Sequence, residues 1–201
     1  MGHSTALLFV GTAVVGFAAS QWFVRCVAMS KGRNIPVGIL AGIAGGLVAS
    51  YVMNVFLVGP GKVLTEAIET PEEKRQVAAL SDGEDATMKA ADMISEIATG
   101  GQHLTHEQRE ADGPLVHYAF GGLMGGLYGG MAELSSATTA GFGTTFGSVL
   151  FTTADLFAVP VARLSPPLAE EPASSMVTPL AAHLVYGATT ELVRRLLRRL
   201  L

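Results

Sequence analysis

Three ionisable side chains lie inside long apolar stretches of this chain: His117, Asp155 and His183. An ionisable group at bilayer depth is costly to bury, so each is a candidate functional residue. Imidazole titrates near neutral pH and a carboxylate can exchange a proton with it, which favours a proton relay. The same residues could instead form a small metal site, or only hydrogen bonds between helices.

These three groups are predicted to share one depth, near the same side of the membrane: the two histidines follow the starts of their helices and Asp155 precedes the end of its helix. Tyr186 follows His183 by one turn of helix and could donate a hydrogen bond to it. Two carboxylates, Glu133 and Glu191, are predicted near the opposite side of the membrane. Glu191 could pair with one of the arginines that follow it.

Other site types have weaker support. Two histidines on separate helices can ligate haem iron, which keeps a cofactor-binding subunit as an alternative. His103 and His106 are fewer than the ligands that zinc needs, and we expect them to be surface residues. The chain has no HExxH motif, no Ser-His-Asp order and no nucleotide-binding glycine loop. We therefore expect no enzyme activity, no metal and no cofactor.

The composition indicates an integral membrane protein. Charged residues are 15% of the chain, against roughly 25% in soluble domains, and hydrophobic residues are 49%. This excludes a disordered chain, and the single cysteine, Cys26, excludes a disulfide scaffold. A net charge of −4 argues against nucleic acid as a partner. The expected surroundings are a lipid bilayer.

The apolar stretches predict an all-α, polytopic fold with about five transmembrane helices, because each is close to the length of a membrane span. The first has no basic residue before it and is predicted to be retained; if it were cleaved, four spans would remain. Gly59-Pro60-Gly61 is predicted to end the second span, and Asp112-Gly113-Pro114 to open the third. The stretches are 5–24, 36–58, 114–134, 142–162 and 178–193.

The spans divide the chain into residues 1–61, an acidic segment 62–112, and a three-helix region 113–201. The acidic segment predicts short helices: a capping box starts at Thr70, and residues 85–99 form an amphipathic pattern ended by Gly100. We expect them to lie on the membrane surface or on the bundle.

Lysines and arginines set the orientation. They gather in the first loop and in the tail after residue 193, whereas segment 62–112 is acidic. The pattern predicts an outside N-terminus and a cytoplasmic C-terminus.

Glycines recur at steps of four along the predicted spans. Small residues let helices approach closely in lipid, so this spacing predicts a tight bundle. A narrow path or a bound flat cofactor would use the same spacing. The candidate packing positions are Gly42, Gly46, Gly121, Gly125, Gly129 and Gly147.

Three motifs lie between residues 114 and 199. They are His117, Tyr128 and Ala132-Glu133; then Leu164-Ser165-Pro166-Pro167 after Pro160; and Ala182-His183-Leu184-Val185 followed by Glu191 and Arg194-Arg195. With this spacing the chain resembles the YagU-like inner-membrane proteins, a family of uncharacterised function. The resemblance implies a bacterial inner-membrane location and a loose association with acid survival, and it supplies no reaction.

Two functions remain in competition. The first is a structural or accessory membrane subunit that assembles with itself or with another membrane protein. The alternative is a proton-linked channel or transporter that uses the intramembrane histidines and Asp155.

Overall fold

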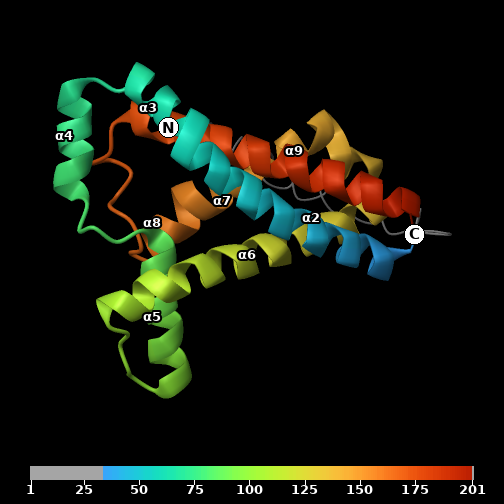
Figure 1. Ribbon diagram of the computed structural model, residues 1–201, viewed down its shortest axis with the longest axis horizontal. Helices are drawn as coiled ribbons and strands as arrows, with labels where there is room; N and C mark the ends of the chain where they lie inside the picture. The colour runs from blue at the N-terminus through green and yellow to red at the C-terminus, as the bar shows by residue number, and fades with distance from the viewer. Residues whose placement is uncertain (1–33, 201) are drawn as a thin grey trace, which may run out of the picture.

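The structure is a computed structural model that describes residues 34–200 (Figure 1). Every regular element among these residues is a helix, which confirms the all-α prediction for this part of the chain. The predicted first span, residues 5–24, and Cys26 lie outside the described residues.

Helices α2 (Ile35–Phe56), α6 (His106–Leu134) and α9 (Val177–Leu200) form the centre of the bundle (Figure 1). α2 packs against both α6 and α9, and α7 (Thr144–Thr153) packs against α9. α2 begins after Asn34, whose side chain accepts a hydrogen bond from the Val37 N–H at 3.3 Å. Its proline in the first turn needs no N–H there, so the start is favourable.

Gly59-Pro60-Gly61 does not end the second helix, and that prediction is wrong. The chain continues through a π-helical turn, η1 (Leu57–Gly61), into α3 (Lys62–Ile68). A proline inside an α-helix lacks an N–H and clashes with a preceding carbonyl, whereas a π-turn widens the backbone locally. The wider turn therefore carries Pro60 without breaking the helix.

The fourth predicted span is interrupted in a similar way. The helical segment that contains it starts earlier, with η2 (Ser136–Gly143), a 3₁₀ segment that leaves helical geometry at Ala140, Gly141 and Phe142. It continues through α7, a π-turn η3 (Ala154–Ala158) and the short α8 (Val159–Val161). Within the described residues, Ile35–Ile68 and Ser136–Val161 are the two helical segments long and apolar enough to cross a membrane. α6 and α9 do not combine length and apolar composition to the same degree.

The acidic segment contains the predicted short helices. α4 (Pro71–Leu80) starts with the Thr70–Glu73 capping box, and α5 (Ala86–Thr99) starts at Asp85 and ends at a left-handed Gly100. Met88 and Ala91 of α5 are buried, but Ile94, three residues after Ala91 on the same face of the helix, is 51% exposed.

α6 begins earlier than predicted, because the Thr105–Gln108 capping box starts it at His106 and leaves Pro114 inside the helix. α5 and the first turns of α6 form a helical hairpin, residues 85–113, that projects from the bundle (Figure 1). α9 follows a 3₁₀ turn, η4 (Ala173–Met176), and extends past the predicted residue 193 to Leu200. Arginine is a good helix former and a cation is favourable in a last turn, which accounts for the longer helix.

The helices meet backbone to backbone at the six candidate glycines. A Cβ on Gly42 would overlap the Gly125 carbonyl oxygen, and one on Gly46 would overlap the Gly121 carbonyl oxygen. Gly129 approaches the start of α2 in the same way, and Gly147 of α7 lies against the carbonyl of His183. These contacts fix how α6, α2, α9 and α7 sit around the polar groups described next.

Candidate functional site

The predicted site residues separate into two groups near opposite ends of the bundle. We call the first the arginine layer: Tyr128, Glu133, Glu191, Arg194, Arg195 and Arg198. We call the second the histidine layer: Ser50, His117, Asp155 and His183.

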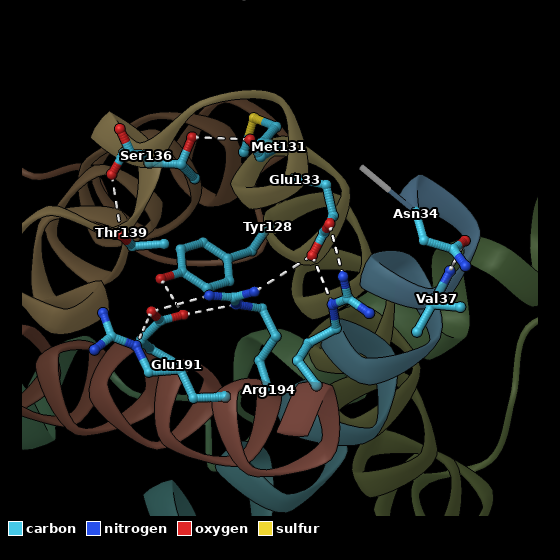
Figure 2. Close-up of polar contacts among 12 residues, drawn as sticks. Asn34, Val37, Tyr128, Met131, Glu133, Ser136, Thr139, Glu191 and Arg194 are labelled. Atoms are coloured by element: carbon cyan, nitrogen blue, oxygen red, sulfur yellow. Dashed lines mark hydrogen bonds and ion pairs between the residues drawn. The ribbon is translucent and has the colours of Figure 1, made fainter. Parts of the chain in front are cut away.

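Glu191 is the centre of the arginine layer (Figure 2). Its side chain is fully buried and accepts a hydrogen bond from the Tyr128 hydroxyl at 2.9 Å. Arg194 donates to both carboxylate oxygens, at 2.7 and 3.1 Å, and Arg195 donates at 2.5 Å. A buried carboxylate with these partners is satisfied electrostatically and joins α6 to α9.

Glu133 extends the same layer (Figure 2). It is 6% exposed and accepts two hydrogen bonds from Arg198, at 2.8 and 3.1 Å. Arg194 lies 3.7 Å from it and so links the two carboxylates. The guanidinium of Arg195 also stacks over the Phe142 ring at 4.7 Å. The layer is a network in which each carboxylate has more than one guanidinium partner.

His183 is the most enclosed ionisable residue of the histidine layer, at 7% exposure. Its Nδ1 lies 2.9 Å from the Pro179 carbonyl oxygen and 3.6 Å from the Asp155 carboxylate. A carbonyl only accepts hydrogen bonds, so Nδ1 carries the hydrogen in this contact. The ring also packs on Phe151, at 5.6 Å between centroids.

Asp155 connects this imidazole to open space. It lies in the π-turn Ala154–Ala158, and its side chain is 36% exposed. It lines a cavity of about 220 Å³ together with Phe151 and Pro179. π-turns are frequent at functional sites because they redirect a side chain out of helical register.

His117 and Ser50 each bury a polar atom without a hydrogen-bond partner among the described residues, Nε2 and Oγ respectively. Such atoms are rare in folded proteins and are usually met by water or an ion. Of the three predicted residues, the structure brings His183 and Asp155 into contact, and His117 lies within electrostatic range of both. The described residues contain no group of three or more His, Cys, Asp or Glu side chains that could hold a metal ion.

Tyr186 does not bond to His183 as predicted. Its hydroxyl donates to the Gly121 carbonyl at 2.5 Å, because the long phenol side chain reaches across to α6. Sequence reasoning also missed Ser50, the Tyr128–Glu191 bond and the Arg198–Glu133 pair. The only signal for the last pair was that both residues fall near the same end of their predicted spans.

The two histidines of the hairpin are exposed, as expected, and both pair with acids. His103 lies 3.0 Å from Asp92, which also accepts the Leu104 N–H at 2.6 Å. The hydrogen bond between His103 and Asp92 raises the pKa of His103 and lowers the pKa of Asp92. Glu84 holds His106 at 2.8 Å and Arg109 at 3.1 Å.

Comparisons with protein-family models, curated proteins and solved structures find no match to this chain. The YagU-like resemblance therefore remains a prediction.

Proposed function

We propose that this protein is an integral protein of the bacterial plasma membrane that serves as a structural or accessory subunit. The observation that carries the proposal is the distribution of apolar side chains. Leu40 and Leu123 are each 64% exposed and Phe157 is 69% exposed, whereas Ser50 and Glu191 are at 1% and 0%. Soluble proteins bury large apolar side chains, but helices in lipid pack through small and polar residues.

The same distribution supports four of five proposed spans: α2 with α3, α6, α7 with α8, and α9. The fifth, residues 5–24, lies outside the described residues and is proposed from its apolar sequence. α6 and α9 are less apolar than the other two described spans, yet both pack along α2. Their polar side chains in the arginine layer face each other, so insertion of α2 would carry them into the bilayer without exposing those charges to lipid. The arginine layer then lies at the cytoplasmic side and the hairpin outside.

The arginine layer and the glycine contacts support a structural role. Buried carboxylates bonded to guanidinium groups are not free to exchange protons or ligands, and the glycine faces leave helix backbones in direct contact. What the bundle offers to its surroundings is an apolar outer surface. In a membrane such a surface faces lipid or another membrane protein, including a second copy of this chain.

Membrane topology gives the first test. In a Cys26→Ser background, Gly100→Cys in the hairpin should react with an impermeant maleimide on intact cells. Ser136→Cys, next to the end of α6, should react only after lysis. A chain released from membranes by alkaline carbonate would contradict the proposal.

The accessory role has its own test. Native mass spectrometry of protein extracted in mild detergent should give a mass above that of one chain, corresponding to a second copy or a partner. A bare monomer would argue against assembly and would favour the second candidate function.

The second candidate is proton-linked transport, favoured by the His183–Asp155 pair beside an open cavity. In liposomes with a pH gradient, wild-type protein should then carry proton flux that Asp155→Asn and His183→Gln abolish. Glu170→Gln, on an exposed loop, is the matched control. Wild-type flux that both variants retain would exclude a role for this pair.

A further inference from the structure

The last turns of α9 present two adjoining stripes on the outer face of the bundle. Leu192, Leu196 and Leu200 recur at four-residue steps and are 48%, 49% and 81% exposed. Arg195 and Arg199 are also exposed and lie beside them on the helix surface. Residues three and four apart share a helix face, so the leucines and the arginines form one continuous surface.

This surface lies where the bundle ends. Arg198 pairs with Glu133, which is one residue from the end of α6. A Cβ on Gly38, in the first turn of α2, would meet the Glu133 side chain, and Figure 2 shows the start of α2 at Asn34 and Val37 beside it. In the proposed membrane arrangement, on which this inference rests, Arg195 and Arg199 lie at the level of the lipid headgroups.

The charge at this end is not balanced. Four arginines of α9 face two carboxylates, Glu133 and Glu191, and no other acidic residue of the described chain lies at this end. Arg194 and Arg198 lie between the carboxylates. Arg195 donates to Glu191 through Nε, and no described residue pairs with Arg199. Four arginines against two carboxylates leave an excess of two positive charges, and Arg195 and Arg199 are the two guanidinium groups exposed to the outside of the bundle.

We propose that this surface is a binding site for an anionic phospholipid. The phosphate lies between Arg195 and Arg199, and an acyl chain lies along Leu192 and Leu196. Guanidinium groups match phosphate oxygens in geometry and keep their charge at any physiological pH. A soluble phosphate would leave the leucine stripe uncovered, whereas a phospholipid covers both stripes, and anionic lipids attract basic side chains at a membrane surface.

The test is native mass spectrometry of the full chain in mild detergent, titrated with phosphatidylglycerol and, separately, with phosphatidylcholine. Wild-type protein should retain phosphatidylglycerol preferentially. Each arginine near an anionic surface contributes roughly a fivefold factor in affinity, so Arg195→Gln with Arg199→Gln should weaken retention on the order of 30-fold. Arg199→Gln alone, which disturbs no described contact, should weaken it about fivefold.

The matched control removes two arginines from the other end of the molecule, Arg75→Gln with Arg163→Gln, and should retain phosphatidylglycerol like the wild type. Equal loss in the control and the α9 variants would overturn the inference, as would equal retention of both lipids by the wild type.

Flotation with phosphatidylcholine vesicles separates this result from the proposed function. If the wild-type chain floats with these vesicles but shows no lipid preference, only the proposed lipid site is contradicted. If the chain fails to float, the proposed membrane location is contradicted as well.

Discussion

The arginine layer and the histidine layer involve the same helices, α6 and α9, but they differ in how their buried polar atoms are satisfied. Glu191 accepts hydrogen bonds from three side chains, whereas Nε2 of His117 and Oγ of Ser50 have no partner among the described residues. A satisfied polar network makes a packing unique and rigid, and a partly satisfied one leaves capacity for water, protons or ions. The arginine layer therefore holds α6 and α9 together. The histidine layer is the part of the bundle with polar atoms available to bind water, protons or ions.

The largest effect on stability should come from breaking the ion pairs of the arginine layer. Glu191→Ala leaves Arg194, which is 9% exposed, buried without its main carboxylate. Removing one partner of a buried ion pair typically costs about 3–5 kcal/mol of unfolding free energy. Unfolding in mild detergent, followed by circular dichroism, measures this loss. Glu170→Ala on an exposed loop should change little, and equal stability of the two variants would remove the contrast between the layers.

The glycine contact between the layers should give the next largest effect. A Cβ at Gly42 would overlap the Gly125 carbonyl, so Gly42→Ala forces α2 and α6 apart. Overpacking of this kind costs roughly 1–3 kcal/mol. Gly59→Ala is the control, because nothing lies within 4 Å of a Cβ built there. If both alanine variants unfold alike in the same assay, close backbone approach does not hold the layers in place.

The histidine layer should contribute less to stability. Asp155 has a side chain 36% exposed beside an open cavity, and its 3.6 Å contact with His183 is longer than any hydrogen bond to Glu191, so the pair holds the helices more weakly. Asp155→Asn should change the unfolding free energy by less than about 1 kcal/mol. Under the transport candidate the same variant loses proton flux. A stability loss as large as that of Glu191→Ala would mean that the histidine layer stabilises the fold as much as the arginine layer does.

The smallest effect lies outside both layers and identifies pH responses that belong to the hairpin. The raised pKa of His103 adds stability that is present below its ordinary value of 6.5 and is lost as the pH rises through the raised value. The lowered pKa of Asp92 adds stability that is present above 3.8 and is lost as the pH falls through the lowered value. Hydrogen-exchange protection of the Leu104 amide should therefore be greatest between these values.

His103→Gln should abolish the loss of protection on the alkaline side and leave the acidic side in place. If the Leu104 amide of this variant still lost protection as the pH rose, the loss would belong to a group other than His103.

Local features of this fold could be predicted from the sequence. The capping box at Thr70 acts within four residues, so its spacing is enough to place the start of α4. The glycine steps of four likewise predicted which helix faces lie at contacts. Each of these signals is contained in one short stretch of chain.

What the sequence could not supply depends on how each helix is rotated about its axis. Tyr128 and Glu191 are 63 residues apart, and Glu133 and Arg198 are 65 apart. Their pairing requires the relative rotation of α6 and α9, which the packing of all the helices decides. The π-turn at Pro60 was missed for a related reason. A proline flanked by glycines usually ends a helix, and only the surrounding packing keeps the helix from α2 to α3 continuous.

Pro114 has a mechanical consequence for α6. The helix has 29 residues and is about 43 Å long at a rise of about 1.5 Å per residue, so it forms a rod that carries the hairpin at one end. Proline donates no hydrogen bond to the preceding turn, which makes the rod most compliant at that point. A load applied at Gly100 bends α6 at Pro114, so the load is taken up before the glycine contact that begins at Gly121. The hairpin tip is therefore the place to attach an epitope tag or a rigid fiducial without disturbing the bundle.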